Sequence, residues 1–136
     1  PIDEIMWMVA GGLAFIPLAV QKSYIPLLER IRKATNRIGV KYSVNFLYSL
    51  GHGDYGYHIR KVFPHFEPMV GHDGNRSREC HCPLSPVWRE WMIQSVQVMG
   101  QTHPVRFWIE DDFRYVNHGP VRFGCFCPRH LREFGK

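Results

Sequence analysis

Strand-like and helix-like segments alternate along this chain. Residues 2–10 form a nearly continuous apolar run that predicts a strand near residues 3–10. Residues 40–47 alternate with a period of two, and residues 105–110 form a short third strand pattern. Between them, residues 24–38 and 86–99 have apolar positions at helical spacing. Strands that alternate with helices pair in parallel through right-handed crossovers. The order therefore predicts an α/β fold with parallel strands and outer helices.

Residues typical of helix boundaries stand at the ends of both helical segments. Ser23 precedes the first segment and Gly39 follows it. Ser85 and Pro86 open the second segment, and Gly100 follows it. Serine favours the N-cap, proline the first turn and glycine the position after the last turn. These residues set the predicted boundaries of the two helices.

Length and charge limit the function classes. The 136 residues are enough for one domain, so residues 1–136 are expected to form a single domain. The formal net charge is +5, but the basic residues are scattered and do not interleave with aromatic residues. We therefore expect no nucleic-acid partner. We also expect no membrane partner, because no apolar run reaches the length of a membrane span.

The two ends of the chain indicate a piece of a larger domain. Asp3 and Glu4 stand where a secretory signal would carry positive charge, so we expect a reducing compartment such as the cytoplasm. The chain opens directly into a strand pattern and stops at residues 135–136, just after a helix pattern begins. Such a piece would leave strand edges unpaired, which favours a homo-oligomer.

Three consecutive acids follow the third strand pattern, at Glu110, Asp111 and Asp112. Like charges side by side repel one another, so they are seldom placed at a strand end for stability alone. One reading makes one acid a general acid, or a ligand for a metal or a sugar, with its pKa set by a neighbour. The other reading pairs a carboxylate with Arg114 or with a loop amide. His118 follows nearby and adds weight to a functional site.

Further polar candidates follow the second strand pattern. The loop at residues 48–58 is rich in Gly, His, Asp and Tyr and includes His52 and Asp54. Residues 59–79 are also expected to be loop-like, with a second polar turn at residues 71–75. In α/β folds the site lies at the carboxyl ends of the strands, which is where this loop and the acids fall. The loop could bind a polar ligand or form a surface turn with its polar groups satisfied. Trp108 could be a core residue or a stacking platform for a sugar ring.

The four cysteines occur as two Cys-x-Cys pairs, which are Cys80/Cys82 and Cys125/Cys127. Disulfides would have to run between the pairs, since cysteines two residues apart rarely bond to each other. Metal ligation is the second reading, because Cys125, Cys127 and His130 form a compact hook of three ligands at a helix start. Cys82 can supply the fourth ligand, with Cys80 or His81 as substitutes. Buried or free thiols are the third reading.

The pattern resembles a known family at these residues. Residues 82–86, Cys-Pro-Leu-Ser-Pro, open a helix, and a later strand ends in acids. The motif Cys125-x-Cys127-x-x-His130 then follows, and it leads into Leu131-x-x-Phe134. This order is similar to glycoside hydrolase family 42 and related clan A β-galactosidase-like barrels. The resemblance implies the first half of a (β/α)₈ TIM barrel, since a full barrel needs about 250 residues. It also implies a structural zinc ion, with His130 in place of the family's last cysteine.

The resemblance implies action on O-glycosidic bonds of a carbohydrate substrate. Asp112 would be the proton donor, with Asp111 and Glu110 as neighbours, although the family has Asn-Glu where this chain has Asp111-Asp112. Arg114 would orient the substrate. The residues expected to line the sugar site are Asn45, His52, Asp54, Trp108 and His118. The family's nucleophile lies on a late strand that this chain does not contain, so the chain alone is expected to lack glycosidase activity.

A second hypothesis makes the chain a non-catalytic segment. It would bind carbohydrate without hydrolysing it, or it would be a structural unit stabilised by zinc. Both hypotheses share the same metal ligands, which are Cys82, Cys125, Cys127 and His130. They differ in whether a second carboxylate stands near Asp112 in the complete protein.

Overall fold

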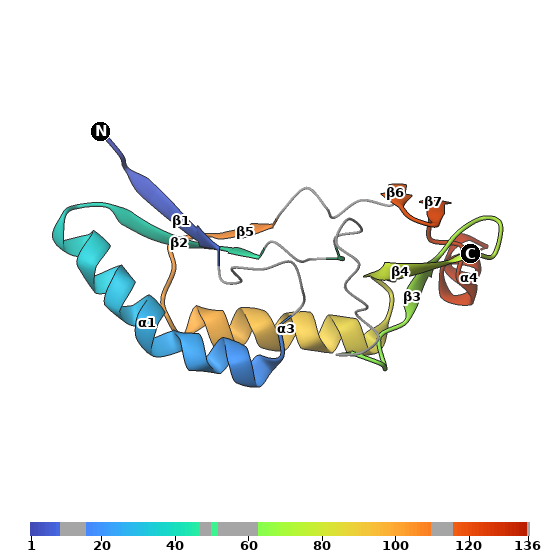
Figure 1. Cartoon of the computed structure of the whole chain (residues 1–136), viewed down its shortest axis with the longest axis horizontal. Helices are drawn as coiled ribbons and strands as arrows, with labels where there is room; N and C mark the ends of the chain where they lie inside the picture. The colour runs from blue at the N-terminus through green and yellow to red at the C-terminus, as the bar shows by residue number, and fades with distance from the viewer. Residues whose placement is uncertain (9–15, 47–49, 52–62, 110–115, 136) are drawn as a thin grey trace.

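The computed structural model describes residues 1–8, 16–46, 50–51, 63–109 and 116–135. Figure 1 shows a small parallel sheet with two long helices beneath it, and two hairpins with a short helix toward the C-terminus. The strands are β1 (Glu4–Met8), β2 (Lys41–Phe46), β3 (Pro68–Val70), β4 (Arg76–His81), β5 (Phe107–Ile109), β6 (Val116–His118) and β7 (Val121–Phe123). The helices are α1 (Leu18–Arg37), α3 (Pro86–Gly100) and α4 (Pro128–Phe134).

The parallel sheet has the strand order β1-β2-β5. Glu4 pairs with Lys41 at one end of β1, and Met8 pairs with Asn45 at the other. The alternation of β2 sends Tyr42 and Val44 toward α1 and α3, where they are buried. We call this group the sheet core; its buried members are Leu28, Tyr42, Val44, Val98 and Met99. The three strand patterns seen in the sequence therefore do pair in parallel.

The two long helices differ in how well the sequence predicted them. The side chain of Ser85 caps α3 by accepting a hydrogen bond from the backbone N–H of Trp88, as its position predicts. By contrast, α1 begins at Leu18, well before the predicted start, and continues through Pro26. Ser23 does not cap α1, because its hydroxyl donates to the carbonyl of Val20 inside the helix, at 2.7 Å. A proline inside a helix removes one hydrogen bond, and packing of α1 on the sheet core offsets that loss.

The two hairpins form a second core with the N-terminal half of α3. β3 pairs antiparallel with β4, and β6 with β7, while a single bridge joins Gly71 to Gly124. Gly124 has no room for a side chain, since a Cβ atom there would lie 2.5 Å from Cγ of Met69. We call the buried group the hairpin core; its members are Leu50, Phe66, Met69, Cys80, Trp88, Trp91 and Val121.

The predicted partial (β/α)₈ barrel is wrong. Only β1, β2 and β5 are parallel among the described strands, and the other four form antiparallel hairpins rather than further strands of a parallel barrel. The sequence interpretation treated residues 59–79 as a loop. In the structure, a tight turn with Gly74 at φ +80° and Asp73 accepting from the backbone of Asn75 folds residues 68–81 into a local hairpin.

No helix in the part of the chain that the structure describes combines the length and apolar character needed to cross a bilayer.

Candidate metal centre

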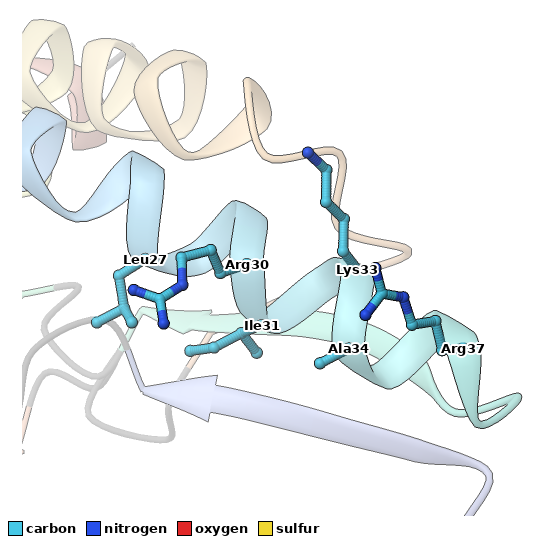
Figure 2. A pocket seen from close by; sticks show the side chains of 6 residues that line it. All are labelled: Leu27, Arg30, Ile31, Lys33, Ala34 and Arg37. Carbon is cyan, nitrogen blue, oxygen red and sulfur yellow. The ribbon is translucent and has the colours of Figure 1, made fainter.

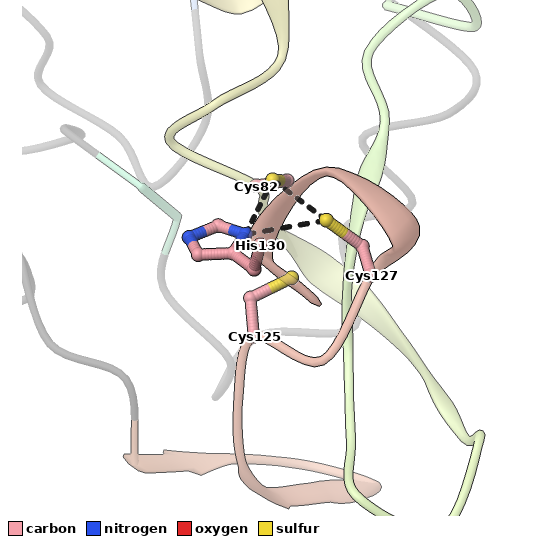
Figure 3. Close-up of side chains that lie close together, drawn as sticks. All are labelled: Cys82, Cys125, Cys127 and His130. Atoms are coloured by element: carbon pink, nitrogen blue, oxygen red, sulfur yellow. Dashed lines mark hydrogen bonds between the residues drawn. The ribbon is translucent and has the colours of Figure 1, made fainter. Parts of the chain in front are cut away.

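Four potential metal ligands meet between the end of β4, the segment after β7 and the first turn of α4. Cys82 directly follows β4, in a turn closed by a 2.9 Å hydrogen bond from the N–H of Ser85 to the carbonyl of Cys82. Cys125 and Cys127 follow β7, and His130 lies in the first turn of α4. Figure 3 shows the three sulfur atoms and the imidazole of His130 converging from these segments.

The ligand atoms are close enough to share one ion. Sγ of Cys82 lies 3.5 Å from Sγ of Cys127 and 3.5 Å from Nδ1 of His130. Sγ of Cys127 lies 3.2 Å from the same nitrogen. With Cys125 included, all four ligand atoms lie within 4.8 Å of one another. This Cys₃His group could hold a metal ion.

The surroundings of the group limit access by water. Cys82 is 0% exposed and Cys127 is 5% exposed, while Cys125 and His130 are half-buried. The backbone N–H of Val70 donates to Sγ of Cys125 at 3.3 Å. A donor aimed at sulfur stabilises the thiolate, which is the form that ligates metals.

The thiols of the group influence one another's ionisation. A hydrogen bond from the Cys82 thiol to the Cys125 sulfur is the main cause that lowers the pKa of Cys125 to about 5. The same hydrogen bond, together with burial, raises the pKa of Cys82. Further thiolates at this spacing would repel the first, so full ionisation of the group needs a cation among the sulfurs.

The two substitute ligands considered from the sequence are not part of the group. The Cys80 thiol donates to the carbonyl of Gly51 at 3.3 Å, and Cys80 is a member of the hairpin core. The ring of His81 is buried edge-on against Phe66, with ring centroids 4.7 Å apart. Burial lowers the pKa of His81 to about 3, so its imidazole is neutral. The disulfide reading also fails in this structure, because all four cysteines are free.

An ion pair that the sequence analysis missed holds α4 beside the group. Arg129 donates from Nε to Oε2 of Glu67 at 2.9 Å and from Nη2 to Oε1 at 2.8 Å. These bonds lower the pKa of Glu67 and raise the pKa of Arg129. Both side chains are about 40% exposed, so water screens the pair and it contributes little to stability. No local signal links residues 62 positions apart in the sequence.

Most of the predicted sugar-site residues lie outside the described residues. These are Glu110, Asp111, Asp112, Arg114, His52 and Asp54. His118 lies in β6, away from the parallel sheet. Asn45 and Trp108 are brought together, because they are paired neighbours on β2 and β5 and so share one face of the sheet.

The face that Asn45 and Trp108 share is opposite the sheet core. Asn45 is 3% exposed and Trp108 is 46% exposed. Glu4 lies on the same face of the sheet, where its carboxylate accepts hydrogen bonds from Ser43 and Arg106, and a hydrogen bond from Trp108 also lowers its pKa. The bond from Ser43 is the main cause that lowers the pKa of Glu4. This polar cluster was not foreseen from the sequence, since it depends on the register of three strands.

Comparisons with models of protein families, with curated proteins and with solved structures found no match to this chain. The geometry of the Cys₃His group and its surroundings is therefore the basis on which a function can be inferred.

Proposed function

We propose that this chain binds one structural zinc ion through Cys82, Cys125, Cys127 and His130. The observation that carries the proposal is the spacing of the four ligand atoms, all within 4.8 Å of one another. In a tetrahedral site with Zn–S near ~2.3 Å and Zn–N near ~2.0–2.1 Å, two sulfurs lie about 3.8 Å apart, and a sulfur and a nitrogen about 3.5 Å apart. The distance of 3.5 Å between two sulfurs, and the sulfur–nitrogen distances of 3.5 and 3.2 Å, lie close to these values.

The donor set supports zinc over calcium and magnesium. Thiolate and imidazole are soft or borderline ligands, which suit Zn²⁺ and not Ca²⁺ or Mg²⁺. Four protein ligands fill a tetrahedral ion and leave no position for a reactive water, so the role would be structural. His130 would bind through Nδ1, the ring nitrogen that faces the sulfurs in Figure 3.

The position of α4 supports a structural role. No residue of α4 is buried, and its apolar side chains Leu131 and Phe134 are 56% and 95% exposed. A helix of seven residues that buries so little has no hydrophobic packing to hold it in place. Zinc bound by His130 on this helix, by its N-cap Cys127 and by Cys82 before α3 would supply that attachment, beside the weak Arg129–Glu67 ion pair.

Metal content tests this proposal. Chain purified without chelator is expected to contain about one zinc per molecule, as four ligands at one tetrahedral site require. The matched pair of variants is Cys125→Ser, which removes a ligand, and Cys80→Ser, which removes the cysteine bonded to Gly51. We expect Cys125→Ser to lose the zinc and Cys80→Ser to keep it. Wild-type chain without zinc, or zinc retained equally by both variants, would refute the site.

Carbohydrate binding is a second candidate function. The observation that favours it is the half-exposed indole of Trp108, which lies beside the amide of Asn45 on the face of the sheet opposite the helices. Titration with a β-galactoside, followed by tryptophan fluorescence, is expected to show saturable binding that is at least about tenfold weaker in Trp108→Ala. Phe126→Ala, which removes another exposed aromatic ring, serves as the control. Equal affinity in both variants would remove Trp108 from the site. Hydrolysis of such a ligand is not expected of this chain alone; it stays a prediction for a complete protein that adds a second carboxylate near Asp112.

A further inference from the structure

One side of α1, together with its C-cap residue, carries an apolar stripe with the spacing of a coiled-coil seam, and this side borders the sheet core. Its members alternate at intervals of four and three residues and are Val20, Tyr24, Leu27, Ile31, Ala34 and Ile38. Tyr24 and Ile31 are partly buried against the sheet core, whereas Leu27 is 52% and Ile38 is 74% exposed. Positions spaced by four and three are those that pack against a second helix. The stripe therefore has the pattern of a helix surface made for another helix.

A hollow of about 420 Å³ lies over the C-terminal half of this stripe. Figure 2 shows the side chains that line it, all from α1: Leu27, Arg30, Ile31, Lys33, Ala34 and Arg37. They fall into two overlapping sets, residues 27, 30, 31 and 34 and residues 30, 33, 34 and 37. Each set has the i, i+3, i+4, i+7 geometry of the hole that receives one side chain of a facing helix. Ala34 belongs to both sets, and its short side chain leaves both holes open.

The rim of the hollow is cationic. Arg30, Lys33 and Arg37 are all exposed. No ion pair involves Arg30 or Arg37 among the described residues, and Lys33 stands one turn from Glu29, which is already paired with Arg32. With the stripe as the a and d positions, Arg30 and Arg37 occupy g positions, whose charges select the partner in coiled coils.

We propose that this surface of α1 docks an amphipathic helix of a partner protein, with large apolar side chains entering the two holes and acidic side chains facing Arg30 and Arg37. A second copy of this chain fits poorly, because antiparallel packing of two α1 helices would place these arginines opposite each other. Parallel packing, whether of a second copy or of another helix, would need the e positions, which are Leu28 and Thr35, and both are buried within the chain. The partner helix therefore runs antiparallel to α1, with acidic g positions that face Arg30 and Arg37. The inference is independent of the zinc site.

The test uses the full chain and a synthetic peptide with Leu at its a and d positions and Glu at e and g, which stays monomeric because its own charges repel. A peptide with Lys in place of Glu is the control probe. We expect the acidic peptide to bind at least roughly tenfold more tightly than the basic one, and more weakly as salt rises. Ala34→Lys should abolish binding by filling both holes, and it should fold normally, since both residues favour helices and the position is exposed.

Charge reversal makes the test specific. The double variant Arg30→Glu, Arg37→Glu is expected to bind the basic peptide more tightly than the acidic one. The control double variant Lys22→Glu, Lys41→Glu changes the net charge by the same amount at residues outside the hollow, so it should still prefer the acidic peptide. Failure of the wild-type chain to prefer the acidic peptide, or an unchanged preference after reversal, would overturn the proposal. Tighter binding to anionic phospholipid vesicles or duplex DNA than to the peptide would do the same. The proposal would also be overturned if the wild-type chain formed a dimer and the Ala34→Lys variant were a monomer.

Discussion

Zinc removal by a chelator is expected to lower the free energy of unfolding by about 4 kcal/mol relative to chain held in free zinc at about a thousand times its dissociation constant. The reason is linkage, since an ion that binds the folded ligand group far better than the unfolded chain stabilises the fold by its binding free energy. At about 3 °C per kcal/mol, the midpoint of thermal unfolding should fall by roughly 12 °C. Circular dichroism melts with and without chelator measure the shift.

The control for this experiment is Cys125→Ser, in which one ligand is missing and the chelator should have no effect. Hydrogen exchange should also locate the loss. Amides of α4, such as the N–H of Leu131 that donates to Cys127, should lose protection, because no residue of α4 is buried. Amides of β2 should keep theirs, since the sheet core is separate. A chelator that leaves the wild-type midpoint unchanged would contradict a stabilising metal.

The parallel sheet could be predicted because its signals are local. The period of two in residues 40–47 marks β2, and the apolar run before residue 10 marks β1. The barrel could not be predicted in the same way. Three parallel strands with two helices are common to many α/β arrangements, and whether a sheet closes depends on strands that this order does not specify.

The β3–β4 hairpin had a sequence signal that was misread. Asp73-Gly74 is the dipeptide typical of a hairpin turn, and the structure has Gly74 at φ +80° there. The flanking residues lack a clear alternation, because β3 and β4 are short and meet through a register shift. Because the flanking residues lack a clear alternation of apolar and polar side chains, this segment was interpreted as a loop despite its turn dipeptide.

Three of the four candidate metal ligands could be recognised from their spacing in the sequence, whereas the fourth depends on the fold. Cys125, Cys127 and His130 fall within six positions, so their spacing alone predicted the three-ligand hook. The choice of Cys82 over Cys80 is not local, since it depends on where β4 ends. That strand stops at His81, and the chain turns at Cys82 toward the hook, while Cys80 remains in the hairpin core.

Trp91→Ala is expected to destabilise the chain by about 3–5 kcal/mol, the usual cost of removing a large buried aromatic side chain. Trp91 is 8% exposed and packs edge-on against Phe63 and Phe66, with ring centroids 5.6 and 5.8 Å apart. These contacts join α3 to the hairpin core. Since whole domains have only about 5–15 kcal/mol of stability, denaturant unfolding should show a large fall in midpoint.

Two control variants separate this effect from general damage. Ile93→Ala lies on the same helix but is 53% exposed, so it should cost about 0.5 kcal/mol or less. Val44→Ala removes a buried side chain from the sheet core, which does not include the residues beside Cys82. Phe66 contacts both Trp91 and His81, the residue before Cys82. Trp91→Ala should therefore lower both the stability and the affinity for zinc, whereas Val44→Ala should lower the stability alone. Equal zinc affinity in the two variants would show that the hairpin core does not position the candidate metal ligands.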